Sequence, residues 1–260
     1  MCIRDRLFPA EWTKLRSTAS FWWTSALIIV FGAFYGALFG TASKLGGMPY
    51  APLTVAATMA LTTAIIVIVQ ASMTVTTEYR FGIPPTNFRV APKRWQVAVA
   101  KLVLGAALAA LLTFFGLVVA FAIGDLTAPV PANWVSNTAS RRALWAIPLG
   151  MALITLFQQG VGWIARNTSG AVVTGMGMML LVESIVGFIP RYGADVAKFL
   201  PFGNLMAFMT NSPTQNWTLP VSLLIFAVWA VVAWIVGVVL LETRDAVSYT
   251  HLRAHETRHD

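Results

Sequence analysis

The residues of this chain that could take part in chemistry are few, and most of them lie in one segment. The segment runs from Thr76 to Lys101 and separates two long apolar stretches. It combines an acid, several bases and four helix-breaking residues. Apolar packing does not require such a combination. The segment therefore predicts a surface that a binding partner recognises.

Motifs for hydrolysis or metal-assisted chemistry do not occur in the sequence. There is no G-x-x-x-x-G-K-[ST] phosphate loop and no H-E-x-x-H zinc motif. The histidines are His251, His255 and His259, whose spacing would align them on a helix as a metal site. They lie in a terminal segment that looks foreign to the chain. We therefore expect no enzyme activity, no metal and no cofactor on this polypeptide.

Three polar residues interrupt the apolar stretches themselves. Glu183 is a possible intramembrane functional acid, and a structural acid bonded to a neighbouring helix is an equal alternative. Gln158 and Gln159 favour hydrogen bonds between helices over contact with a substrate.

The composition predicts an integral membrane protein. Hydrophobic residues make up 57% of the 260 residues and charged residues only 11%, against roughly 25% in soluble domains. The net charge of +8 sits in short segments beside apolar stretches. That placement indicates topology and lipid headgroups as its cause, and no nucleic acid partner.

A membrane-spanning helix needs about 20 apolar residues. The sequence predicts six of them, at approximately 21–40, 53–75, 101–123, 144–164, 171–190 and 220–241. Gly32, Gly36 and Gly40 recur at a spacing that lets helices pack closely, which favours packing within the chain over a dimer seam. Lys and Arg are more frequent on one side, which places both termini in the cytoplasm of a multi-pass plasma-membrane protein.

Two further helical features complete the expected all-α fold. Phe8, Trp12, Leu15 and Ala19 share one helical face, which predicts an N-terminal interfacial helix. The segment 198–209 is too short to span and too apolar for an open loop. It predicts re-entrant outer helices between spans five and six, with their backbone buried in protein.

The segment between spans two and three predicts a short cytoplasmic helix of its own. Gly82 and the following prolines end the second span, and a helix over about 85–91 then carries Phe88 and Arg89. A generic positively charged loop is the alternative. We favour the helix because topology alone does not need such a separately bounded element.

The residues of this segment resemble the permease subunit of ABC-2 type transporters of the actinobacterial sort. That family carries a pattern like T-x-E-[FY]-R-x-G-T-x-x-T-x-F-x-x-x-P-[KR]-R, followed by A-K-L. The chain departs from it at Ile83, where the family has threonine, and at the Pro84-Pro85 pair. The matching residues are Thr76, Glu78, Tyr79, Arg80, Gly82, Thr86, Phe88, Pro92, Lys93, Arg94, Ala100, Lys101 and Leu102.

Other stretches resemble the same family over nearly all of residues 11–246. Residues 160–171 resemble its G-x-G-x-x-x-R-N-T-x-G-A turn, in which Arg166 and Asn167 form a cytoplasmic turn between spans four and five. Residues 200–204 resemble its outer loop, and the R-D-A at 244–246 resembles a common ending.

The resemblance implies a permease domain that forms a dimer with a second copy or a paralogue and binds cytoplasmic ABC ATPase subunits. ATP and magnesium would bind only to that partner, and export is the implied direction. A coupling helix between spans two and three would transmit the movement of the ATPase to the spans. The implied ATPase-coupling residues are Glu78, Arg80, Gly82, Phe88 and Arg89.

Two other classes remain as alternatives. One is an ATP-independent carrier or a membrane scaffold that recruits a cytoplasmic partner, although carriers usually need coupling charges and repeats inside the membrane. The other is an intramembrane enzyme, for which no nucleophile and base pair is visible.

Residues 1–6 and 247–260 resemble translated sequencing-adapter read-through, so we expect both to be non-native. The permease domain is then expected over 7–246.

Overall fold

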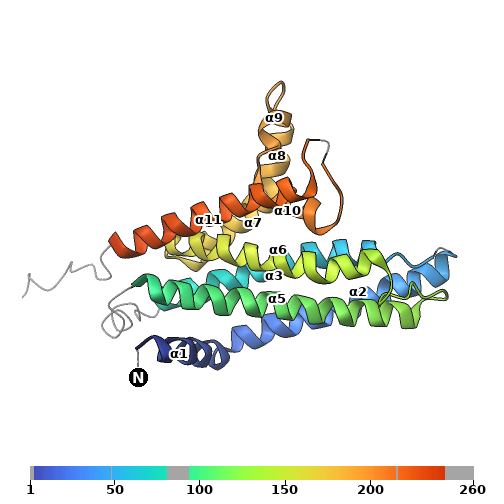
Figure 1. The fold of residues 1–260 in the computed structure, drawn as a ribbon, viewed down its shortest axis with the longest axis horizontal. Helices are drawn as coiled ribbons and strands as arrows, with labels where there is room; N and C mark the ends of the chain where they lie inside the picture. Colours follow the sequence, from blue (N-terminus) through green and yellow to red (C-terminus); the bar gives the residue numbers. More distant parts are fainter. Residues whose placement is uncertain (1–2, 48, 81–93, 215, 244–260) are drawn as a thin grey trace, which may run out of the picture.

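The computed structural model describes residues 3–47, 49–80, 94–214 and 216–243. All regular structure within these ranges is helical (Figure 1). Six helices or helical segments are long and apolar enough to cross a membrane. The expected all-α class is therefore confirmed for these ranges, together with six helices that could span a membrane. Backbone groups in lipid must be satisfied within the segment, which is why apolar sequences of this length form helices.

The helices extend beyond the apolar cores that the sequence predicts. Five of the six candidate spans are single uninterrupted α-helices. They are α2 (Ala19–Gly46), α3 (Pro52–Arg80), α5 (Arg94–Thr127), α6 (Thr138–Ala165) and α11 (Leu219–Thr243). The fifth candidate span consists of α7 (Thr168–Gly177), the π-helical turn η1 (Met178–Val182) and α8 (Glu183–Gly187). The shorter helices are α1 (Ile3–Ser17), α9 (Gly193–Ala197) and α10 (Pro201–Met209).

The continuous spans run side by side, and α1 lies at one end of them (Figure 1). This α1 end also holds the end of α3, the start of α5 and the end of α11. Near the middle of the molecule, α8 and α9 project away from the other helices (Figure 1). The expected fifth span, at approximately 171–190, corresponds to the candidate span Thr168–Gly187, in which η1 replaces part of the α-helix. A π turn inside a helix often marks a functional position.

Glycines bring α2 and α5 into backbone contact. A Cβ atom added at Gly32 or Gly36 would collide with the backbone carbonyl oxygens of Gly116 and Ala120 on α5. The glycine stripe therefore serves packing within the chain, as the sequence favours. Gly160 on α6 and Gly237 on α11 meet in the same way. In lipid there is no hydrophobic driving force for helices to associate. Small residues instead let the helix backbones approach closely and pack.

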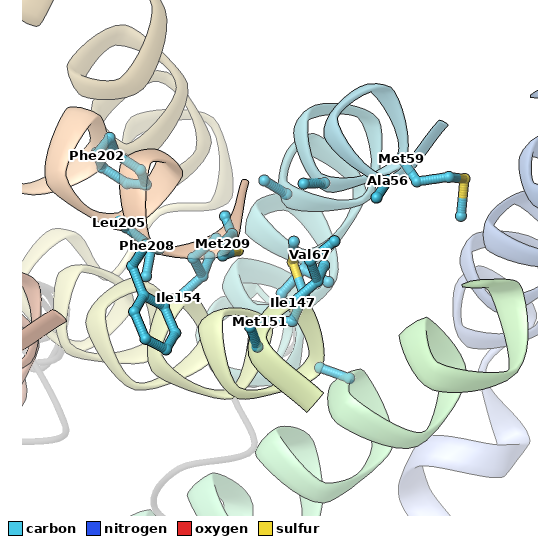
Figure 2. Packing of buried hydrophobic residues seen from close by; sticks show 14 of the residues in the cluster. Ala56, Met59, Val67, Ile147, Met151, Ile154, Phe202, Leu205, Phe208 and Met209 are labelled. Atoms are coloured by element: carbon cyan, nitrogen blue, oxygen red, sulfur yellow. The ribbon is translucent and has the colours of Figure 1, made fainter. Parts of the chain in front are cut away.

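The short helix α10 is packed against the spans rather than extended into solvent. Its Phe202, Leu205 and Met209 are buried and face α6, where Ile154 and Met151 lie (Figure 2). An apolar α10 was expected from the sequence. Its depth in a membrane remains a prediction.

One residue of the expected N-terminal face lies elsewhere. Ala19 is the first residue of α2, because Thr18 has extended dihedrals (φ −91°, ψ 125°) and ends the preceding helix. Phe8 and Trp12 are exposed on α1, whereas Glu11 is buried against the spans. The face of α1 that meets the other helices therefore carries Glu11.

Candidate functional site: a buried ion cluster at the α1 end

The start of α5 carries a buried lysine that joins three helices. Lys101 Nζ lies 2.8 Å from Glu78 Oε1 on α3 and 2.5 Å from Glu11 Oε2 on α1. The Lys101 side chain is only 5% exposed, and those of Glu78 and Glu11 are 10% and 4% exposed. Buried charges are normally paired in this way, because an isolated one is very costly to remove from water.

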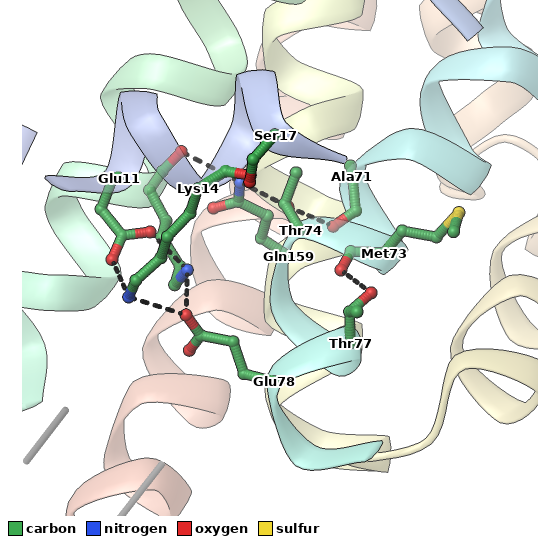
Figure 3. A network of polar contacts seen from close by, with 10 residues as sticks. Glu11, Lys14, Ser17, Ala71, Met73, Thr74, Thr77, Glu78 and Gln159 are labelled. Carbon is green, nitrogen blue, oxygen red and sulfur yellow. Dashed lines mark hydrogen bonds and ion pairs between the residues drawn. The ribbon is translucent and has the colours of Figure 1, made fainter. Parts of the chain in front are cut away.

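Lys14 completes the ion cluster, which we define as Glu11, Lys14, Glu78 and Lys101 (Figure 3). Its Nζ lies 2.8 Å from Glu11 Oε1 and 3.1 Å from Glu78 Oε1. Burial lowers the pKa of Lys14, but the hydrogen bond to Glu11 and the charge of Glu78 outweigh it and raise the pKa above its ordinary value. The cluster contains two positive and two negative groups, so its formal charge is zero.

The four side chains of the ion cluster come from three helices. Glu11 and Lys14 are three residues apart on α1 and therefore share a face. Glu78 lies in the last turn of α3, three residues before the segment 81–93 begins. Lys101 lies two turns into α5, after that segment. The Lys101–Glu78 pair therefore holds together the two helices that flank that segment.

The predicted coupling residues are only partly placed. Glu78 is in the ion cluster, and Arg80 is the last residue of α3. Gly82, Phe88 and Arg89 lie outside the described residues, as does the predicted helix over 85–91. That helix therefore stays a prediction.

The start of α5 is also bound to the end of α11. Arg94 Nη1 donates to the backbone oxygen of Leu241 at 2.9 Å. The backbone N–H of Trp95 donates to Glu242 Oε1, also at 2.9 Å. Both contacts follow directly after the segment 81–93, so α11 is connected to its far end.

The turn between α6 and α7 adds a third connection at this end. Arg166 has left-handed backbone dihedrals (φ 52°), and its N–H caps α6 by donating to Gly162 O. Its guanidinium lies 5.3 Å from the ring centre of Tyr79 and donates to Leu240 O at 3.2 Å. Asn167 Oδ1 accepts from the N–H of Ser169 and caps α7. The two residues of the predicted turn thus cap α6 and α7, and Arg166 also bonds to α11.

Two buried amides connect the spans behind the cluster. Gln158 Nε2 donates to Ser72 Oγ and to Ala171 O, both at 2.7 Å. Gln159 Nε2 donates to Lys101 O at 3.2 Å. These are the interhelical hydrogen bonds that the sequence favours.

Glu183 has a clear structural role. Its two carboxylate oxygens accept from the N–H groups of Phe202 and Gly203, each at 2.5 Å. These are among the first N–H groups of α10, which have no partner inside that helix. The acid therefore caps α10 from α8.

The sequence did not reveal Glu11 as a member of the site. The sequence did contain one signal for such a site. Lys101 is a base at the start of an apolar stretch, and a base in that position needs an acidic partner. Within the described ranges, no group of three or more His, Cys, Asp or Glu side chains could hold a metal ion.

No protein-family model matches this chain. No curated protein matches it either.

Proposed function

We propose that this chain is the membrane-spanning permease subunit of an ATP-driven ABC transporter that works as an exporter. In this proposal a separate cytoplasmic ATPase hydrolyses ATP, and this chain couples the hydrolysis to movement of a substrate across the plasma membrane. The α1 end then faces the cytoplasm, and a second permease copy or a paralogue completes the pathway. The resemblance of residues 76–102 to ABC-2 permeases motivates the proposal.

The observation that carries the proposal is the Lys101–Glu78 ion pair. It joins α3 to α5 at the point where the segment 81–93 leaves one helix and enters the other. A push on that segment would therefore move α3 and α5 together. Glu11 extends the same connection to α1, and Arg94 extends it to α11.

The coupling residues have distinct roles in this mechanism. Phe88 fills an apolar groove of the ATPase, and Arg89 pairs with the acidic rim of that groove. Arg80 and Gly82 support that ATPase contact. Glu78 receives the movement through Lys101. Closure of the ATPase pair around ATP then shifts the ends of four helices.

The test is affinity purification of the tagged chain from its native membrane in mild detergent, followed by mass identification of the bound proteins. A P-loop ATPase is expected to co-purify in a defined ratio. Phe88→Asp and Arg89→Glu are expected to abolish that co-purification. Arg141→Glu is the matched control, because Arg141 is exposed at the opposite end of α6.

Two outcomes would contradict the proposal. One is the absence of any ATPase from the purified complex. The other is a complex that Phe88→Asp and Arg89→Glu leave intact. An ATP-independent carrier or scaffold would give the first outcome, so the same experiment separates the two classes.

A further inference from the structure

A cavity of about 230 Å³ lies beside the ion cluster, and we call it the α1 cavity. It is open to the surface and is formed between α1, α2, α3 and α5. Glu11, Lys14, Glu78 and Lys101 make its charged part. Leu15, Phe21 and Met73 belong to its apolar part.

The polar lining of the α1 cavity offers mainly hydrogen-bond acceptors. The hydroxyl groups of Thr24, Thr74 and Thr77 donate to backbone oxygens of their own helices, so only their oxygen lone pairs face other partners. Glu78 Oε2 accepts no hydrogen bond among the described residues, since Lys14 and Lys101 both bind Oε1. A matching ligand must therefore supply donors.

Gln70 adds a group that can both donate and accept. Its side chain is half-buried and lines the cavity, and its amide has no hydrogen-bond partner among the described residues. A ligand in the cavity can hydrogen-bond to this amide, which offers both N–H donors and a carbonyl acceptor. A hydroxyl group, which also donates and accepts, is the simplest partner for it.

The charges of the cluster disfavour an anionic ligand. Both lysines are already bound to carboxylates, and the formal charge of the four groups is zero. A phosphate would find two carboxylates beside it and would have to displace them from the lysines. An uncharged headgroup avoids this cost.

The position of the cavity favours an amphiphile over a soluble ligand. Trp22 and Trp23 directly follow Phe21 of the cavity wall and are 60% and 73% exposed. Exposed tryptophans are typical of the membrane–water interface. The volume is smaller than the roughly 300–1,000 Å³ of pockets that enclose a whole drug-sized ligand. It therefore suits the headgroup and first carbons of a molecule whose chain continues into lipid.

We propose that the α1 cavity binds the headgroup of an uncharged, hydroxyl-bearing amphiphile such as a monoacylglycerol. The hydroxyl groups would bond to Gln70 and to Glu78 Oε2, and the first carbons would lie against Leu15, Phe21 and Met73. Such a ligand would bridge α1 and α3 beside the ion cluster. This proposal requires no ATPase and does not depend on the proposed function.

The test uses the full chain in phosphatidylcholine nanodiscs that contain a photoreactive monoacylglycerol. After irradiation, mass spectrometry locates the labelled residues. Labelling is expected in residues 11–24 and 70–78 and should fall at least five-fold in Gln70→Leu. Gln96→Leu removes an amide at the same end but outside the cavity, and it should label like the unmodified chain.

A competition experiment on the unmodified chain tests the headgroup without any variant. Excess unlabelled monoacylglycerol is expected to suppress the labelling, whereas lysophosphatidic acid of the same chain length should compete at least five-fold less well. Stronger competition by the phosphate would overturn the headgroup assignment. Labelling spread evenly over the exposed face of α11, or unchanged in a folded Gln70→Leu variant, would overturn the site.

Discussion

Lys101 Nζ lies 2.8 Å from Glu78 Oε1, and this contact joins the two helices that flank residues 81–93. The pair is buried, and Glu11 of α1 shares the same ammonium group. Two ion pairs of one ammonium group therefore connect α1, the end of α3 and the start of α5.

Removal of the Lys101 charge should strongly destabilise the fold. Lys101→Met leaves Glu11 and Glu78 buried without their shared partner, and breaking a buried pair costs about 3–5 kcal/mol. Thermal unfolding in detergent should show a clear fall in midpoint. Lys44→Met removes an exposed lysine near the other end of α2 and should have little effect. An equal midpoint for both variants would refute the importance of the cluster.

Glu11 and Lys101 should show energetic coupling. In a double-mutant cycle, Glu11→Gln with Lys101→Met should cost less than the sum of the two single variants, because each single change already breaks the pair. Unfolding free energies of the four proteins measure this difference. Additive effects would show that α1 is not bound to α5 through this contact.

Lys14 should give the stability an alkaline limit. Its pKa is raised in the folded chain, so its contribution is complete below the ordinary value of 10.5 and is lost as the pH rises through the raised value. The midpoint difference between the unmodified chain and Lys14→Gln should therefore persist at neutral pH and shrink above about pH 10.5. A difference that grows with pH would contradict this sign.

Glu183 should act as a cap for α10 rather than as a titrating group in transport. Glu183→Ala removes the acceptor for the N–H groups of Phe202 and Gly203, and loss of a cap costs about 0.5–2 kcal/mol. Hydrogen exchange of α10 should accelerate. Asp195→Asn, an exposed acid on α9, serves as the control. Unchanged exchange in Glu183→Ala would disprove the capping role.

Gly32 should not tolerate even one added methyl group. Gly32→Ala places a Cβ against the backbone oxygen of Gly116, and overpacking costs typically 1–3 kcal/mol, here on the order of the upper value. Gly46→Ala, also on α2, meets no atom within 4 Å and provides the matched control. Thermal unfolding compares the two. Equal stability would show that α2 and α5 can separate without penalty.

The sequence alone determined the class of fold and the packing of its first span. Six apolar stretches become helices because lipid leaves no other way to satisfy the backbone, and this requirement is local. The glycine stripe of α2 can also be read from the sequence, because its four-residue spacing follows the helical repeat. The segment at 76–102 also stood out, because charge and helix breakers are local signals.

Only the tertiary structure decided which polar side chains meet. Glu11 and Lys101 are 90 residues apart, and Glu183 caps a helix that begins 18 residues later. Such contacts depend on the rotation and axial shift of each helix against its neighbours. Those quantities result from summed packing over whole helix faces, and no short stretch of sequence contains them. The α1 cavity arises in the same way, because residues of α1, α2, α3 and α5 line it together.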